Sequence, residues 1–375
     1  MLIGVPKEIK VHEYRVGLTP MGVHELVSQG HQVLVESFAG MGVGYLDEDY
    51  TNAGASVTGS AEELYLNAEM IIKVKEPQPR ECKLLSEGQT LFAYLHLAAD
   101  RQQTDALIKS GCTAIAFETV TSPGGGLPLL APMSEVAGRM SIQAGAHCLE
   151  KAQSGKGVLL GGVPGVPPAK VLVIGGGVVG ENAARMALGL GAQVTIVDRS
   201  VPRLQQLDAQ FGGRLQTLYS TQNNIEAAVL SADLIVGAVL IPGAAAPKLV
   251  TRDMVERMKP GTVMVDVAID QGGCFETSRP TTHQNPIYEV NHVVHYCVAN
   301  MPGAVARTST LALQNVTLPY AQALASKGWM NAMWDDPHLA NGLNIQRGQV
   351  ACPGVADAFG MPLIPMEKIL SNHKA

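Results

Sequence analysis

The sequence predicts an α/β protein of two doubly wound domains, each a mainly parallel sheet covered by helices. Three observations support this fold class. Short runs rich in β-branched residues alternate with helical stretches along most of the chain. A glycine-rich turn follows one such run near the middle of the chain. The length of 375 residues is enough for two domains of ordinary size, each with its own core.

The first third of the chain contains several runs of strand length. The first helical stretch between them begins at Thr19, the expected N-cap, continues through Pro20 and ends near Gly30. Because strands that alternate with helices form parallel sheets, we expect an α/β domain here. The runs cover residues 2–5, 32–36, 70–75, 90–95 and 112–117.

Two long helices are expected on either side of the central part of the chain. The first starts at Ser134, the expected N-cap, and continues to about Gln153, before a loop rich in glycine and proline. The second covers residues 309–327 and is expected to bend at Pro319. Strands are expected at residues 171–174, 193–197, 234–239, 263–268 and 293–298, and strand-like alternation at residues 339–350.

We expect two domains, with these two helices at the boundaries between them as links. Residues 1–130 and 307–375 are expected to form a discontinuous substrate domain, and residues 131–306 a nucleotide-binding domain. The crevice between two such domains is the default position for a substrate.

The motif in the middle of the chain is a dinucleotide-binding fingerprint. Gly175, Gly177 and Gly180 form G-x-G-x-x-G directly after a buried strand and at the start of an apolar helix. The glycines allow a tight turn, close approach of backbone to a pyrophosphate, and close packing of helix on strand. The N–H groups and the positive dipole end of the helix favour phosphate. This pattern predicts a Rossmann-like domain.

The acid that ends the next β-rich run indicates which dinucleotide binds. A carboxylate at Asp198 accepts hydrogen bonds from a ribose diol and repels a 2′-phosphate. Arg199 and Arg203 lie close by in sequence, and arginine pairs well with phosphate. We therefore expect NAD to be preferred, with NADP disfavoured but not excluded.

Polar residues follow several of the expected strands, where ligands bind in parallel sheets. Lys75 and His96 end two runs of the N-terminal third, and Arg15 lies in the loop after the first strand. Asp270 follows a strand of the nucleotide-binding domain. Taken singly, each has an ordinary structural interpretation, such as a solvated charge, a structural histidine or a turn cap. Together they provide two cations for a carboxylate and two titratable groups.

The composition excludes some classes of protein. Apolar residues make up 46% and charged residues 16%, as in folded proteins, and the net charge of −6 offers no basic field for nucleic acid or an anionic membrane. No signal peptide or membrane span is evident at the N-terminus or in the apolar residues 157–169. The cysteines are scattered without a C-x-x-C pair. We expect a cytoplasmic protein with reduced thiols.

Distinctive segments spread over nearly the whole chain resemble the alanine dehydrogenases, of the alanine dehydrogenase/pyridine nucleotide transhydrogenase family. They are MLIGVPKE (residues 1–8), RVGLTP (15–20), KVKEP (73–77), LHL (95–97), PMSEVAG (132–138) and NMPGAV (300–305).

The resemblance implies a role for individual residues. Arg15 and Lys75 match the pair that holds the substrate carboxylate, and His96 and Asp270 match the catalytic pair. Position 203 is arginine where relatives often carry lysine, so bidentate phosphate pairing becomes possible. The expected cofactor contacts are Ser134, Gly175, Gly177, Val178, Val179, Gly180, Asp198, Arg203, Ser220, Val239, Leu240, Val267, Ala268, Ile269, Asp270, Arg279, Val298, Ala299, Asn300 and Met301.

The activity that the resemblance implies is the NAD-dependent, reversible oxidative deamination of L-alanine to pyruvate and ammonium by a homohexamer. Residues 323–327 lack the acid and histidine with which some relatives bind a metal, so no metal is expected. Three alternatives stay open. These are the NAD-binding component of a proton-translocating transhydrogenase, an oxidoreductase of the saccharopine-forming group, and a catalytically silent NAD-binding scaffold. The sequence does not reveal which proton His96 and Asp270 each transfer.

Overall fold

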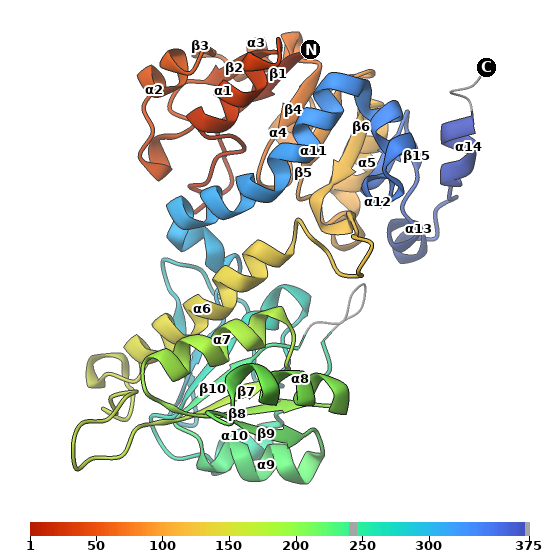
Figure 1. Cartoon of the computed structure of the whole chain (residues 1–375). Helices are drawn as coiled ribbons and strands as arrows, with labels where there is room; N and C mark the ends of the chain where they lie inside the picture. Colours follow the sequence, from red (N-terminus) through yellow and green to blue (C-terminus); the bar gives the residue numbers. More distant parts are fainter. Residues whose placement is uncertain (240–245, 372–375) are drawn as a thin grey trace. The chain divides into compact units, whose positions relative to one another are not determined.

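The computed structural model describes residues 1–239 and 246–371, and it divides the chain into two compact units (Figure 1). The N-terminal unit comprises Met1–Met133 and Gly303–Ala375, and the central unit comprises Ser134–Pro302. Each unit contains one sheet whose strands are mainly parallel. The predicted α/β class with a discontinuous N-terminal unit is therefore confirmed.

The N-terminal unit has an eight-stranded sheet in the order β15-β14-β6-β5-β4-β1-β2-β3. Its strands pair in parallel from β6 to β3, and the hairpin of β14 and β15 adds antiparallel strands next to β6. The strands are β1 (Leu2–Val5), β2 (Gln32–Glu36), β3 (Ser56–Thr58), β4 (Met70–Ile72), β5 (Thr90–Ala93), β6 (Thr113–Ala116), β14 (Leu343–Gln346) and β15 (Gln349–Val350).

Helices flank this sheet. The Thr19 side chain accepts a hydrogen bond from the Gly22 N–H, and Gly30 follows the helix with φ of 86°, so the predicted start and end of the first helix are confirmed. The helices are α1 (Pro20–Ser28), α2 (Asp47–Asn52), α3 (Ala61–Asn67), α4 (Pro79–Cys82), α5 (Arg101–Ser110), α11 (Ala306–Asp335), α12 (Pro337–Ala340), α13 (Pro353–Phe359) and α14 (Met366–Ser371).

Both long helices differ from their predicted form. α6 (Ala131–Cys148) begins before Ser134, so Ser134 lies inside the helix and is not its N-cap. Pro132 fits the first turn of a helix, where its missing N–H costs nothing. In α11 the backbone leaves helical angles at Gly328, with φ of 73° and ψ of 153°, directly after the predicted end at residue 327, whereas Pro319 keeps helical angles. Glycine adopts such a positive φ without steric cost.

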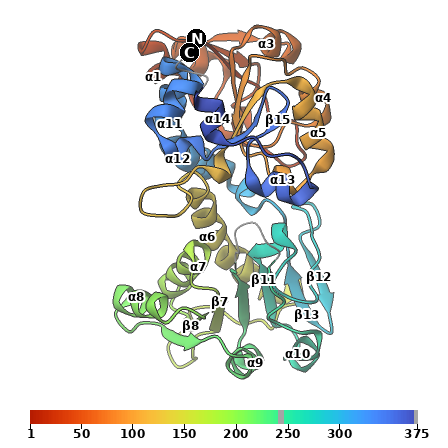
Figure 2. The ribbon, with the colours of Figure 1, turned by 90° about the vertical axis from the view of Figure 1, so that its right-hand side faces the viewer.

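The central unit has a seven-stranded sheet in the order β12-β13-β11-β10-β7-β8-β9, and Figure 2 shows β12 and β13 at one side of it. All neighbours are parallel except β12 and β13, which form a hairpin through Asn291 and His292, both at positive φ. The strands are β7 (Lys170–Ile174), β8 (Gln193–Asp198), β9 (Gln216–Tyr219), β10 (Leu234–Gly237), β11 (Val263–Asp266), β12 (Ile287–Val290) and β13 (Val293–Tyr296), and the helices α7 (Val178–Gly189), α8 (Val201–Phe211), α9 (Gln222–Ser231) and α10 (Arg252–Arg257).

Within the described ranges, none of the helices is both long and apolar enough to cross a membrane. All of the cysteines are free thiols, and burial raises the pKa of Cys82, Cys112, Cys148, Cys274, Cys297 and Cys352.

Candidate active site

The glycine-rich turn of the central unit joins β7 to α7 and has room for a phosphate group. Gly175 has φ of 107°, and a Cβ there would lie 2.6 Å from the Ala238 carbonyl oxygen. A Cβ on Gly180 would lie 1.8 Å from the Gly175 carbonyl oxygen. In contrast, a Cβ on Gly177 would meet nothing within 4 Å. Two glycines are therefore needed for the turn and its packing, and the third leaves the backbone open to a ligand.

The first turn of α7 presents N–H groups beside this opening. Its N-cap is Gly177, which has no side chain to cap Val178, Val179 or Gly180. The unsatisfied N–H groups and the helix dipole suit an anion. The turn therefore fits the pyrophosphate of a dinucleotide.

Asp198 ends β8 and lies against the same turn. One carboxylate oxygen accepts the N–H of Gly176 at 2.7 Å, and the other accepts the N–H of Ser200 at 2.7 Å. Each carboxylate oxygen has a second lone pair, so two more donors can bind. The position and the remaining capacity of Asp198 suit a ribose diol.

Arg203 is already engaged by protein groups. Its Nε donates to the Gly176 carbonyl oxygen at 2.6 Å, and its Nη2 pairs with Glu181 at 2.7 Å. Burial raises the pKa of Glu181, but hydrogen bonds from Arg203, Gln210 and Arg185 outweigh this effect and leave the pKa below its usual value. Arg203 therefore links the glycine turn to Glu181 of α7.

The other predicted cofactor contacts of the central unit lie mostly just after the carboxyl ends of its parallel strands. Leu240 lies outside the described residues. Asp270 is exposed, in a 3₁₀ helix (Val267–Gln271) that starts after β11. Ser220 follows β9, Val239 follows β10, the residues Val267, Ala268, Ile269 and Asp270 follow β11, and Val298, Ala299, Asn300 and Met301 follow β13.

Asp266, the last residue of β11, organises the backbone around that 3₁₀ helix. Its carboxylate accepts the Ala268 N–H at 3.1 Å, the Cys274 N–H at 2.9 Å and the Ser278 hydroxyl at 2.5 Å. Burial raises its pKa, and these hydrogen bonds oppose the rise. The buried Asp266 therefore fixes the loop that carries the exposed Asp270.

In the N-terminal unit, Arg15 lies in the loop after β1 and is buried. Its Nε donates to Oε1 of Glu13 and its Nη2 to Oε2, both at 2.6 Å. Its Nη1 lies 3.0 Å from the Met133 sulfur. Burial lowers the pKa of Arg15, but the hydrogen bonds and charge of Glu13 raise it by more. The guanidinium stays positive and is held in one orientation.

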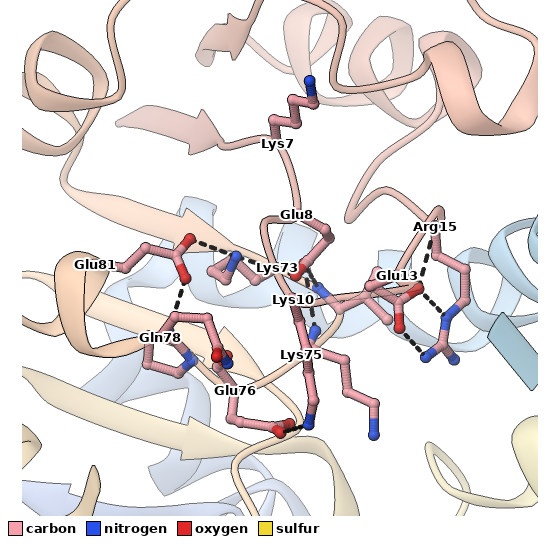
Figure 3. A network of polar contacts seen from close by, with 12 residues as sticks. Lys7, Glu8, Lys10, Glu13, Arg15, Lys73, Lys75, Glu76, Gln78 and Glu81 are labelled. Carbon is pink, nitrogen blue, oxygen red and sulfur yellow. Dashed lines mark hydrogen bonds and ion pairs between the residues drawn. The ribbon is translucent and has the colours of Figure 1, made fainter. Parts of the chain in front are cut away.

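Lys75 follows β4, and a buried carboxylate fixes its backbone (Figure 3). Glu8 accepts the N–H of Val74 at 2.7 Å and that of Lys75 at 3.3 Å. It also pairs with Lys73 at 3.1 Å, and Lys73 pairs with Glu81 at 2.7 Å. β4 ends at Ile72 and not at the predicted residue 75, although backbone hydrogen bonds to the β5 segment continue as far as the Val74 carbonyl oxygen, which accepts the Tyr94 N–H at 3.1 Å.

A further ion pair lies next to Lys75 in the sequence. Lys10 pairs with Glu76, as Figure 3 shows. Burial raises the pKa of Glu76, but the charge of Lys75 and the hydrogen bond from Lys10 bring it below its usual value. Glu76 is therefore an anion that acts electrostatically on Lys75.

His96 follows β5 in a left-handed conformation with φ of 51°. Glu118 accepts its N–H at 2.6 Å and that of Leu95 at 3.2 Å. β5 ends at Ala93 and not at the predicted residue 95. The Nδ1 of His96 lies 3.8 Å from Glu118, and its ring stacks on Tyr94 with a centroid distance of 5.8 Å. The side chain is 45% exposed and thus accessible. A strained, well-anchored and accessible histidine is typical of functional sites.

Models of two domain families match the sequence. The alanine dehydrogenase/PNT N-terminal domain matches residues 4–137, and the alanine dehydrogenase/PNT C-terminal domain matches residues 141–353. The alanine dehydrogenase of Halomonas elongata is 62% identical over 99% of this chain and 100% of its own length. The alanine dehydrogenase of Bacillus subtilis is 56% identical over 100% of this chain and 99% of its own length.

The chain belongs to the alanine dehydrogenase/PNT family.

Solved structures of the family agree with this membership. A structure described as L-alanine dehydrogenase is 55% identical, covers 96% of this chain and 99% of its own, and has a TM-score of 0.93. The structure of a transhydrogenase from Sinorhizobium meliloti is 26% identical and has a TM-score of 0.82. It covers 93% of this chain and 100% of its own. The expected family and enzyme class, alanine dehydrogenase, are confirmed. The family and the Rossmann-like fold imply a nicotinamide nucleotide cofactor.

Several residues that organise this alanine dehydrogenase/PNT family site were not predicted from the sequence. They are Glu8, Glu13, Lys73 and Glu118, which hold the predicted site residues in place. One signal for Glu13 was its spacing of two residues from Arg15. No local pattern pairs Glu118 with His96, because strand pairing brings them together across the sheet. Among the described residues, no group of three or more histidine, cysteine, aspartate or glutamate side chains could hold a metal ion.

Proposed function

We propose that this protein catalyses the reversible, NAD-dependent oxidative deamination of L-alanine to pyruvate and ammonium. The observation that carries the proposal is that the four chemical groups this reaction needs all follow parallel strands. Arg15, Lys75 and His96 do so in the N-terminal unit, and Asp270 in the central unit. We assign substrate binding to residues 1–130 and 307–375, and NAD binding to residues 131–306.

The central unit would hold NAD by its glycine turn and Asp198. Bound NAD supplies the acceptor for the hydride that leaves the α-carbon of alanine. The carboxylate of Asp198 supports NAD over NADP, because it can accept hydrogen bonds from a ribose diol and repels a 2′-phosphate. The residues that lie after β10, β11 and β13 would line the rest of the dinucleotide site, as in parallel sheets generally.

Arg15 and Lys75 would bind the substrate carboxylate. Arg15 is buried and fixed by Glu13, and Lys75 is fixed through its backbone by Glu8. Two cations on anchored backbone orient a small zwitterion, so that its α-hydrogen has one direction. Burial of the guanidinium strengthens its hold on a carboxylate, because fewer water dipoles screen the charges.

His96 and Asp270 would move the protons of the reaction. Loss of hydride leaves an imine, which gains water and loses ammonia, and both steps transfer protons. General acid–base catalysis by such groups contributes about 10²–10⁴-fold in rate. Glu118 would keep His96 in its orientation, because its carboxylate accepts the His96 N–H and lies 3.8 Å from the imidazole Nδ1.

A second candidate is the NAD-binding component of a transhydrogenase, which the transhydrogenase structure with a TM-score of 0.82 favours. The higher identity to proteins named alanine dehydrogenase supports the first candidate. Purified protein, NAD and a panel of amino acids would separate the two. NADH formation with L-alanine in the absence of any partner supports the dehydrogenase, and its absence refutes it. We also propose a homohexamer, which size-exclusion chromatography with light scattering would test, and a cytoplasmic location, which fractionation of cells would test.

The assignment of the proton-transferring residues has its own test. His96→Ala and Asp270→Asn are expected to abolish alanine oxidation while NADH still binds, as measured by its fluorescence. Near-normal turnover by either variant would remove that residue from the mechanism.

A further inference from the structure

Tyr288 contacts Arg279 in two ways. The hydroxyl of Tyr288, on β12, accepts the N–H of Arg279 at 2.8 Å and donates to the Thr277 carbonyl oxygen at 2.8 Å. The guanidinium of Arg279 lies over the Tyr288 ring, 4.2 Å from its centroid. One tyrosine therefore fixes both the backbone and the charged end of Arg279.

The two residues before Arg279 are anchored as well. The Thr277 hydroxyl donates to Nε2 of the buried His295, on β13, at 2.7 Å. The Ser278 hydroxyl donates to Asp266, at the end of β11, at 2.5 Å. Three consecutive residues are thus held by side chains of three neighbouring strands. A shift of the segment would break these hydrogen bonds, of which the Thr277–His295 bond is buried.

His295 keeps the stack beneath Arg279 neutral. Its ring stacks on Tyr288 with a centroid distance of 5.0 Å and an interplanar angle of 22°. Its Nδ1 lies 3.0 Å from the Val293 carbonyl oxygen and must donate, so Nε2 accepts from Thr277. Burial lowers the pKa of His295, and the charge of Arg279 lowers it further. The guanidinium is therefore the cation of this stack.

This anchoring supports a residue that is itself exposed. Arg279 is exposed, and it belongs to the same unit as the glycine turn and Asp198. An arginine whose only role is to lie hydrated on the surface needs no such anchoring, because its side chain loses conformational entropy when it is held in one position. Holding a binding group in place before the ligand arrives removes that entropic cost from binding.

We propose that Tyr288 is a positioning residue for the cofactor: it holds Arg279 at the carboxyl edge of the central sheet and thereby sets the affinity for the nicotinamide nucleotide. The inference rests on the proposed function and on the contact between Arg279 and the cofactor that the family resemblance implies. Tyr288 itself does not touch the cofactor in this account, so its whole effect on binding passes through Arg279.

A double-mutant cycle on NADH binding tests this. Titration of the full-length protein with NADH, followed by fluorescence, gives Kd for the wild type, Tyr288→Leu, Arg279→Ala and the double variant. We expect Tyr288→Leu to raise Kd about fivefold, the effect of losing a partly exposed cation–π contact. Tyr288→Phe, which keeps the ring, should raise Kd less. In the Arg279→Ala background, Tyr288→Leu should leave Kd unchanged.

A matched control removes another tyrosine ring from beneath an arginine. Arg307 lies 5.4 Å from the centroid of Tyr45 in the N-terminal unit, so Tyr45→Leu should leave Kd for NADH unchanged. Thermal unfolding without NADH reports the folding of each variant, and the cycle is repeated with Tyr288→Phe if Tyr288→Leu unfolds.

Each remaining outcome overturns a defined part of the account. An unchanged Kd in Arg279→Ala removes Arg279 from the proposed cofactor site, and the role of Tyr288 with it. A raised Kd in Arg279→Ala but not in Tyr288→Leu refutes the positioning role alone. Equal effects of Tyr288→Leu in both backgrounds show that the tyrosine acts on binding by another route.

Discussion

Replacement of Glu13 by glutamine breaks the ion pair that holds Arg15 while keeping the shape of the side chain. The two side chains are 2% and 0% exposed, and both hydrogen bonds measure 2.6 Å. Removing one partner of a buried pair costs about 3–5 kcal/mol, because a buried charge is left uncompensated. The amide oxygen of glutamine can keep one bond to Arg15, so we expect the lower end, about 3 kcal/mol. The midpoint of thermal unfolding should fall by about 5 °C.

The substrate carboxylate provides a second readout. If Arg15 binds it, pyruvate supplies the missing negative charge in Glu13→Gln, and saturating pyruvate should raise the unfolding midpoint more in the variant than in the wild type. Glu62→Gln is the matched control, because Arg80 and Glu62 form an exposed pair at 2.7 Å, and the loss of a pair screened by water should leave the unfolding midpoint nearly unchanged. A Glu13→Gln variant as stable as Glu62→Gln, or one that gains nothing from pyruvate, would refute the reasoning.

Three further predictions follow from the geometry. Gly180→Ala should unfold at lower temperature, because its Cβ would lie 1.8 Å from the Gly175 carbonyl oxygen, whereas Gly177→Ala should keep the wild-type midpoint and lose NADH binding. Equal midpoints would contradict the first part. Lys75→Ala should raise the KM for alanine strongly, and an unchanged KM in steady-state kinetics would exclude carboxylate binding. His295 has a pKa below its ordinary 6.5, so the unfolded state binds the proton more readily. The stability that depends on neutral His295 is present above about pH 6.5 and is lost as pH falls below it. In thermal unfolding, the midpoint of His295→Gln should fall less than that of the wild type as the pH is lowered below about 6.5.

The sequence was sufficient to predict the elements that depend on local patterns. Strands β1 and β2 have the predicted bounds, and the first helix starts after Thr19 as expected, because alternation and capping are local signals. β9 and β12 were not predicted, since they lie at the edges of the central sheet and are only partly buried. Edge strands lack the continuous apolar run that marks a buried strand.

Of the candidate site, the sequence could indicate only those residues that follow directly after strands. Lys75 and His96 were proposed in this way. Glu8 and Glu118, which accept backbone N–H groups beside them, were not predicted, because their partners are distant in sequence. Tyr288 was missed for the same reason. Its strand pairs antiparallel to β13, and the contacts it makes with Arg279 become visible only in the fold.

The decisive measurement is the initial rate of NADH formation by the purified protein with NAD and L-alanine. We expect turnover with L-alanine and none with D-alanine, which cannot present its α-hydrogen in the same direction while its carboxylate is held. Addition of pyruvate and ammonium should consume NADH. A protein that binds NADH but oxidises no amino acid under these conditions would contradict the account.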